Sequence, residues 1–240
     1  MDITKVTKPI RKLLKLKYCG AVIVAAGRAS RMEGLDKVMA PLGGEPMIAR
    51  TVRAFQNCDA IREIVVVTRP DLLTAVMGLC KDMDKVRAVV AGGKDRPESV
   101  MNGLNALSGK VKLAAIQDGA RPLITWQVID RTVRAANSYG AAAPAVAVKD
   151  TIKEVAGGLV DHTPERSRLQ AVQTPQVFDV DLLRAALKKA RAEDIPITDD
   201  CSAVELMGMK VKIVEGDERN IKVTTPMDLK IAQLFMEEGQ

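Results

Sequence analysis

The amino-acid sequence predicts an α/β protein built on a mostly parallel, doubly wound sheet. Apolar runs of strand length alternate along the chain with segments whose apolar residues recur at helical spacing. The first such run ends in small residues, as strands that lead into a ligand-binding turn do. The chain has 240 residues, of which 47% are hydrophobic, so it is long and apolar enough for one sizeable core.

The alternation extends over the first two thirds of the chain. The segments are strand 21–24, helix 46–56, strand 64–67, helix 71–81, strand 86–90, helix 98–107, strand 113–116, helix 127–138 with Thr125 as N-cap, and strand 141–148. Strands and helices in this order imply parallel strands joined by right-handed crossovers. Ligands of such sheets bind beyond the carboxyl ends of the strands.

The pattern changes after residue 149. Two short segments, 151–155 and 159–162, flank Gly157-Gly158 and predict a hairpin that projects from the sheet. Helical and strand patterns return at 180–191, 202–207 and 210–214, and a last helix begins with Thr225 as N-cap and Asp228 in the capping-box position. We therefore expect a basic extension at 1–18 and one domain at 19–240, with a β-arm at about 149–168.

Composition excludes several classes of function. No apolar run approaches the ~20 residues that span a membrane. The four cysteines are widely spaced without a C-x-x-C pair, which favours a reduced, cytoplasmic protein. The single histidine excludes histidine-rich zinc sites and disfavours a histidine base. Any chemistry must therefore use Asp, Lys, Arg, Thr and a hard metal ion.

The net charge of +6 is concentrated at the N-terminus. Residues 1–18 carry +5, so the remaining chain is nearly neutral at +1. A basic arm suits nucleic acid or an anionic membrane, but it also fits a solvated extension. The body has neither a basic stripe nor the aromatic residues that stack on bases, since aromatic residues make up 2% of the chain. We expect neither a nucleic-acid partner nor a membrane.

Four clusters of small and charged residues fall where strands end or helices begin. Residues 25–32 form an Ala-Ala-Gly turn with two arginines, suited to a phosphate cradle, although they match neither G-x-x-x-x-G-K-[ST] nor G-x-G-x-x-G. Residues 92–99 place a Gly-Gly turn before a helix. Asp118, at the carboxyl end of a strand, is a candidate ligand for Mg²⁺. In the fourth cluster, Asn220 is a candidate metal ligand and Lys222 a candidate phosphate contact. Each cluster alone also fits an ordinary turn or loop.

Together, the clusters resemble the family of 2-C-methyl-D-erythritol 4-phosphate cytidylyltransferases over residues 19–238. The motifs that carry the resemblance are VIVAAG-x-x-x-RM (22–32), GG-x-x-R-x-x-SV-x-x-GL (92–104), D-G-ARP (118–122), VKDTIKEV (148–155), L-x-x-x-QTPQ-x-F (169–178), ITDD-x-SA-x-E (197–205) and VEGDERNIKVTTP-x-DL (214–229). Their common order makes the match specific. The resemblance implies a GT-A-like nucleotidyltransferase fold and a homodimer formed by the arms.

The implied reaction transfers CMP from CTP to methylerythritol phosphate and releases pyrophosphate, with Mg²⁺ as cofactor. The resemblance implies nucleotide binding by Ala25, Ala26, Gly27, Gly93, Arg96, Ser99 and Asp118. It implies catalytic roles for Arg31, Lys37, Arg166 and Lys222, and metal binding by Asp118 and, as a further candidate, Asn220. It implies that the acceptor contacts Thr151, Arg121, Arg166, Thr174 and Thr198, with the arm residues acting across the dimer.

The phosphate loop departs from the family pattern at three positions. Ala29 stands where a second glycine is usual, and Asp36 and Val38 flank Lys37 in place of Pro and Gln. The segment between Arg31 and Lys37 is also about one residue short. Three alternatives remain: a cytidylyltransferase for another polyol phosphate such as ribitol 5-phosphate, a dinucleotide-dependent oxidoreductase, and a nucleic-acid-binding module that uses residues 1–18.

Overall fold

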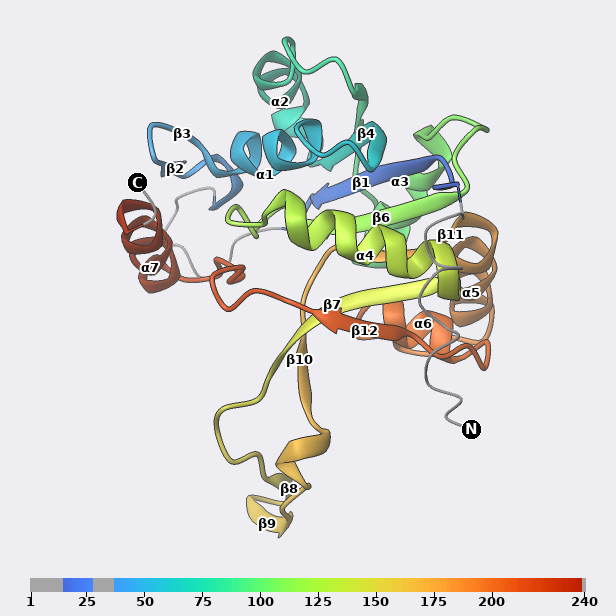
Figure 1. Cartoon of the computed structure of the whole chain (residues 1–240), viewed down its shortest axis with the longest axis vertical. Helices are drawn as coiled ribbons and strands as arrows, with labels where there is room; N and C mark the ends of the chain where they lie inside the picture. The colour runs from blue at the N-terminus through green and yellow to red at the C-terminus, as the bar shows by residue number, and fades with distance from the viewer. Residues whose placement is uncertain (1–14, 28–36, 239–240) are drawn as a thin grey trace, which may run out of the picture.

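The computed structural model describes residues 15–27 and 37–238, and a single twisted sheet forms the centre of this part of the chain (Figure 1). Its elements are β1 (Cys19–Ala25), β2 (Pro41–Leu42), β3 (Glu45–Pro46), α1 (Met47–Gln56), β4 (Ile61–Thr68), α2 (Leu73–Leu79), β5 (Val86–Ala91), α3 (Arg96–Ala106), β6 (Leu113–Asp118), α4 (Trp126–Tyr139), β7 (Ala141–Ala147), β8 (Glu154–Ala156), β9 (Leu159–His162), β10 (Gln170–Val172), β11 (Gln176–Asp179), α5 (Val180–Ala192), α6 (Asp200–Glu205), β12 (Lys212–Glu215) and α7 (Pro226–Glu237).

The first half of the sheet is parallel, as the sequence predicts. The strand order is β10-β7-β11-β6-β1-β4-β5, and β12 pairs with β7. Strand β1 is parallel to β4 and to β6, and β4 is parallel to β5. Strand β11 runs antiparallel between β6 and β7, and β10 is antiparallel to β7. The sequence pattern did not predict β10 and β11, because they have only three and four residues and, unlike β8 and β9, do not flank a Gly-Gly turn.

Helices cover both faces of the sheet, so the fold is doubly wound. Alternate residues of β1 point to opposite faces. Ile23 packs with buried residues of α1, α2 and α4, such as Val52, whereas Val22 packs with buried residues of α3, α5 and α6, such as Leu104. None of the described helices combines the length and apolar character that crossing a bilayer requires.

The ends of the helices test the predicted caps. Thr225 and Asp228 form a complete capping box at the start of α7, as predicted. Thr125 stands at the N-cap of α4, but its side chain makes no capping hydrogen bond. The helix predicted at 71–81 is shorter: a 3₁₀ turn at Pro70–Leu72 precedes α2, which ends at Leu79.

The predicted hairpin is present as β8 and β9, and Figure 1 shows it at the tip of an arm that extends away from the sheet. The chain leaves the body after β7 and returns through β10. At the tip, Gly157 and Gly158 adopt φ angles of +59° and +83°, which side chains other than glycine rarely adopt. The arm strands are exposed throughout, so within one chain the arm has no core of its own.

We expect Gly103→Ala to destabilise the protein. A Cβ at Gly103 would lie 2.2 Å from Val22 Cγ1 and 2.9 Å from Val67 Cγ2, where α3 packs on the sheet. Overpacking of this kind costs about 1–3 kcal/mol of unfolding free energy, measurable by urea denaturation. Gly78→Ala is the matched control, because a Cβ at this exposed helical position meets nothing within 4 Å. It should stabilise by up to about 1 kcal/mol; equal effects of the two changes would contradict the packing.

Candidate functional site

A cavity of about 570 Å³ opens at the carboxyl ends of β1 and β6, beside the N-terminus of α3. This is where a doubly wound sheet is expected to bind its ligands. The cavity brings together segments far apart in the sequence. Its lining residues are Val24, Ala25, Ala26, Gly27, Lys37, Val38, Gly93, Lys94, Asp95, Arg96, Ser99, Asp118, Ala120 and Lys222.

Small residues form the wall at the end of β1. Gly119, directly after β6, lies close against the end of β1. An added Cβ at Gly119 would lie 2.9 Å from Ala25 Cβ and 3.1 Å from the Val24 carbonyl oxygen. An added Cβ at Gly92 would lie 2.3 Å from Ala26 Cβ. The turns after β1, β5 and β6 therefore meet through backbone and methyl groups, and the cavity wall at Ala25–Gly27 is mainly backbone.

The N-terminus of α3 forms the second wall. Ser99 Oγ accepts a hydrogen bond from the Gly93 N–H (3.1 Å) and donates one to the Asp95 carbonyl (2.8 Å). Asp95 caps the helix by accepting from the Glu98 N–H at 2.8 Å. The turn is thus fixed by its own side chains, and the positive end of the helix dipole faces the cavity.

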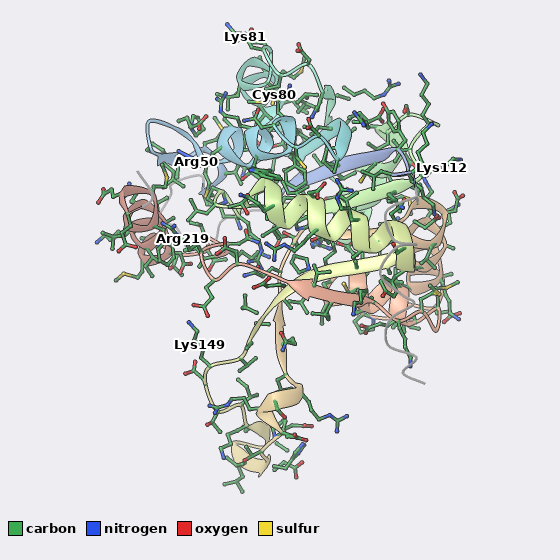
Figure 2. The ribbon with its side chains drawn as sticks, in the orientation of Figure 1. Arg50, Cys80, Lys81, Lys112, Lys149 and Arg219 are labelled. Atoms are coloured by element: carbon green, nitrogen blue, oxygen red, sulfur yellow. The ribbon has the colours of Figure 1, made fainter. Side chains whose placement is uncertain are left out.

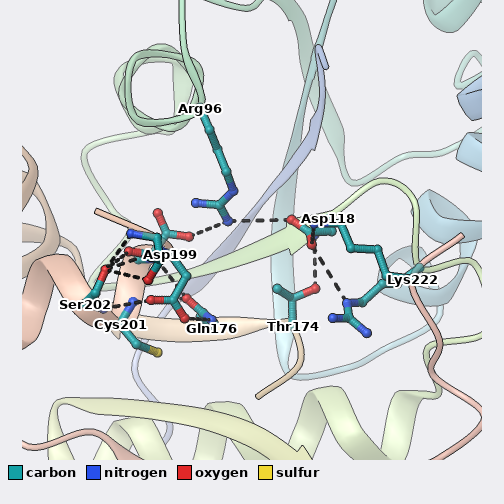
Figure 3. A network of polar contacts seen from close by, with 11 residues as sticks. Arg96, Asp118, Thr174, Gln176, Asp199, Cys201, Ser202 and Lys222 are labelled. Atoms are coloured by element: carbon teal, nitrogen blue, oxygen red, sulfur yellow. Dashed lines mark hydrogen bonds and ion pairs between the residues drawn. The ribbon is translucent and has the colours of Figure 1, made fainter. Parts of the chain in front are cut away.

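Asp118, the last residue of β6, lies among three cationic side chains (Figure 3). Lys222 Nζ is 2.8 Å from Asp118 Oδ2, Arg96 Nη2 is 3.6 Å from Oδ1, and Arg121 Nε is 3.9 Å from Oδ2. The Asp118 N–H donates to Thr174 Oγ1 at 3.1 Å. Three other segments of the chain, which carry Arg96, Thr174 and Lys222, therefore meet at Asp118.

The cations keep Asp118 ionised. Its burial opposes ionisation, but Lys222 and then Arg96 outweigh the burial, and together they hold the pKa of Asp118 below its ordinary value. The cavity lining therefore combines two carboxylates, Asp95 and Asp118, with a surplus of positive charge from Lys37, Lys94, Arg96 and Lys222. Such a site suits a polyanion that brings its own metal ion.

Behind the cavity, Arg96 is tied to a fully buried carboxylate. Arg96 Nη2 donates to Asp200 Oδ2 at 2.7 Å, and Asp200 has no exposed surface. Burial raises the pKa of Asp200, although Arg96 opposes the shift. Gln176 Oε1 accepts from the backbone N–H groups of Asp200 and Cys201, each at 3.1 Å. The sequence reasoning missed Asp200 and Gln176 as parts of the site, although both lie in the motifs ITDD and QTPQ.

Arg121, Thr174 and Asn220 lie next to Asp118 but do not line the cavity. Arg121 donates to the Asn220 carbonyl at 2.7 Å, and Asn220 Nδ2 donates to the Thr174 carbonyl at 3.0 Å. Asn220 is fully buried, and its Oδ1 has no hydrogen-bond partner among the described residues. Its amide supports the connection between β10 and β11, which contains Thr174, and the metal role of Asn220 stays a prediction.

The remaining predicted residues lie elsewhere or outside the described ranges. Thr151 is exposed on the arm, and Arg166 donates to the Lys149 carbonyl at 3.0 Å, where the arm leaves the body (Figure 2). Thr198 is exposed before α6, where its N–H donates to Ser202 Oγ. None of these lines the cavity of its own chain. Arg31 lies outside the described residues.

The comparison with known proteins identifies the family. The family model described as 2-C-methyl-D-erythritol 4-phosphate cytidylyltransferase matches residues 19–238. The chain belongs to this family. The 2-C-methyl-D-erythritol 4-phosphate cytidylyltransferase of Caldanaerobacter subterraneus is 44% identical over 225 residues, covering 90% of this chain and 97% of that protein. The enzyme of the same name from Geobacillus kaustophilus is 45% identical over 219 residues, covering 90% and 96%.

Solved structures of the family share the fold. The 4-diphosphocytidyl-2C-methyl-D-erythritol synthase of Anaerococcus prevotii is 31% identical with a TM-score of 0.85, covering 93% of this chain and 98% of that one. The cytidylyltransferase of Thermus thermophilus is 30% identical with a TM-score of 0.75, covering 90% and 98%. The chain is therefore a nucleotidyltransferase, and membership of the family argues against the alternative of a dinucleotide-dependent oxidoreductase. The nucleic-acid alternative rests on residues 1–18, most of which lie outside the described ranges.

We expect Lys222→Met to raise the pKa of Asp118. The substitution removes the nearest cation from a carboxylate whose burial already favours the neutral form. In the unmodified protein the carboxylate protonates only as the pH falls through its lowered pKa, so in the variant protonation should begin at higher pH. A pH titration of the carboxyl carbon by NMR measures the shift. Lys212→Met, which removes a lysine lying over the Tyr139 ring instead, is the control. An unchanged Asp118 pKa in the Lys222 variant would contradict the ion pair.

Proposed function

We propose that this chain transfers CMP from CTP to the phosphate of 2-C-methyl-D-erythritol 4-phosphate, releasing pyrophosphate and forming 4-diphosphocytidyl-2-C-methyl-D-erythritol. The observation that carries the proposal is the cavity at the end of β6. There an ionised Asp118 lies within reach of Lys222 and Arg96, and a backbone wall at Ala25–Gly27 faces a helix N-terminus. The family relatives carry this activity in their names.

The reaction needs charge compensation more than it needs a base. An oxyanion of the acceptor phosphate attacks the α-phosphorus of CTP, and the bond from that phosphorus to the bridging oxygen breaks as pyrophosphate leaves. The attacking oxygen is already ionised, so no histidine has to remove a proton. The enzyme's task is to hold two polyanions in line and offset their repulsion. Lys37 and Lys222 line the cavity, and we propose that they fill this role together with Arg31.

The nucleotide binds, in this proposal, against the backbone of Ala25, Ala26 and Gly27 and the Gly93–Ser99 turn. N–H groups at a helix start favour anions, and the close contacts between turns leave the backbone exposed to the ligand. Arg96, the first residue of α3, contributes a guanidinium to the same wall.

Mg²⁺ fits the residues present. It commonly takes one or two carboxylates together with substrate phosphates and water, and Asp118 places an ionised carboxylate in the cavity. Bound there, the metal would neutralise charge on the triphosphate. The described group of side chains with suitable spacing for a metal, Glu154, Asp161 and His162, is instead exposed on the arm.

The acceptor side is proposed to form across a homodimer. Thr151 and Arg166 sit on the arm, away from the cavity of their own chain, whereas Arg121, Thr174 and Thr198 lie on the body. The arm also exposes large apolar side chains, among them Leu159 at 78% and Val160 at 58%, which a partner subunit would cover. A cytoplasmic location accords with four free, buried cysteines.

We expect Asp118→Ala to lower turnover by about 10²–10³-fold without unfolding the chain, because it removes the charge that the cavity cations surround. Pyrophosphate release from CTP measures turnover, with methylerythritol phosphate and ribitol 5-phosphate supplied separately. Asp130→Ala is the control, since Asp130 pairs with Arg134 on the surface of α4. Near-full activity of Asp118→Ala would refute the site, and turnover of ribitol phosphate alone would change the acceptor.

Arg166→Ala should raise the KM for the acceptor on the order of tenfold or more, because a guanidinium–phosphate contact is lost. If the arm acts across a dimer, mixing this variant with Asp118→Asn restores activity, since a hybrid dimer contains one intact site. Random exchange predicts about a quarter of the normal rate. Absence of any restoration after verified subunit exchange would place Arg166 and Asp118 in the same site of one chain.

A further inference from the structure

A single nitrogen of Arg96 lies between two carboxylates. Nη2 is 2.7 Å from Asp200 Oδ2, a hydrogen-bond distance, and 3.6 Å from Asp118 Oδ1, an ion-pair distance without a hydrogen bond. Figure 3 shows the Arg96 side chain extending toward Asp118, with dashed lines that mark its polar contacts. Asp118 lines the cavity, whereas Asp200 is fully buried beneath it. The buried acid therefore holds the arginine more closely than the cavity acid does.

The burial of Asp200 is costly for the fold. Its Oδ1 has no hydrogen-bond partner among the described residues, and Arg96 is the cation that the structure pairs with Oδ2. A buried ion pair with an unsatisfied oxygen stabilises a protein no better than apolar residues of similar size. The stability of the fold alone therefore does not account for a carboxylate at this position. A role in fixing the position of the Arg96 guanidinium does account for it.

The backbone that carries Asp200 is fixed to the strand that leads to Asp118. Gln176 accepts from the Asp200 and Cys201 N–H groups and donates to Asp199 Oδ2 at 2.7 Å. Gln176 lies on β11 opposite Ile116 of β6, two residues before Asp118. Both carboxylates are thus mounted on one rigid frame, so the position of Arg96 between them is set by the fold.

We propose that Asp200 is a positioning residue for nucleotide binding, which holds the Arg96 guanidinium in the cavity wall and prevents it from closing on Asp118. The inference rests on the proposed function, because it assumes that CTP binds in this cavity. Without the charge on Asp200, the strongest remaining attraction for Arg96 is Asp118, which still carries its own. Arg96 would then pair with Asp118 Oδ1, and both groups would be withdrawn from the nucleotide.

The test is a double-mutant cycle on Asp200 and Arg96, with CTP binding measured by calorimetry on the full chain in Mg²⁺. Asp200→Asn should weaken CTP binding on the order of tenfold, in line with the loss of a charged hydrogen bond. In steady state the KM for CTP should rise more than kcat falls. In the Arg96→Ala background, Asp200→Asn should cause no further loss of affinity. An unchanged affinity in Asp200→Asn, or an equal loss in both backgrounds, would overturn the proposal.

Asp199→Ala is the matched control. Asp199 caps α6 and bonds Gln176 but makes no hydrogen bond to Arg96, so its removal should lower the melting temperature and weaken CTP binding much less than Asp200→Asn does. If it weakens CTP binding as much as Asp200→Asn does, the effect arises from loosening of α6 and the proposal fails.

Two further outcomes keep the test decisive. If Asp200→Asn does not fold, Arg96→Ala and the Arg96→Ala/Asp200→Asn double variant are compared, since the double variant leaves neither charge unpaired. Equal CTP affinity of these two supports the proposal, and weaker binding by the double variant overturns it. Failure of the unmodified protein to bind CTP would instead refute the proposed function, whatever the variants do.

Discussion

The rest of the site depends on one constraint: a single carboxylate, at the end of a central strand, must remain charged inside a largely buried wall. Asp118 meets this constraint because Lys222 and Arg96 approach it from two other segments and Arg121 from the turn that follows it. Those cations in turn leave the cavity with a surplus of positive charge, which a triphosphate and a phosphate acceptor would balance. The positive charge of the cavity therefore complements the negative charge of the proposed substrates.

The topology of the fold brings those charges together. The parallel strands β1 and β6 end at the same edge of the sheet, and glycines at the turns let their backbones approach each other. The antiparallel β11 then fits between β6 and β7 and brings Thr174 to the backbone of Asp118. Loop 217–225 closes the far side and carries Lys222. Four regions that are far apart in the sequence become neighbours only through this topology.

Much of this arrangement was predictable from the spacing of apolar residues and from the small residues that mark turns. The alternation of apolar runs predicted the parallel half of the sheet, and the turns after β1 and β6 marked Ala25–Gly27 and Asp118, because ligands bind at strand ends. The short strands β10 and β11 carry too few residues for a period to show. Asp200 was not predicted for a different reason. A carboxylate in a polar stretch of sequence is typical of a solvent-exposed helix cap, and the burial of Asp200 depends on Arg96, which is 104 residues away in the sequence. Pairings of that range follow from topology, which local patterns do not contain.

The tip and the base of the arm differ in how well they can tolerate insertions and deletions. At the tip, exposed glycines with positive φ angles join strands that touch little else of their own chain, so insertions or deletions in this turn would leave the central sheet unchanged. At the base, Val172 ends β10, and two residues later Thr174 contacts Asp118. A single added residue between them would shift the register of β11 against β6. Natural variation in arm length is therefore expected to accumulate at the hairpin turn, and the base is expected to keep a constant length.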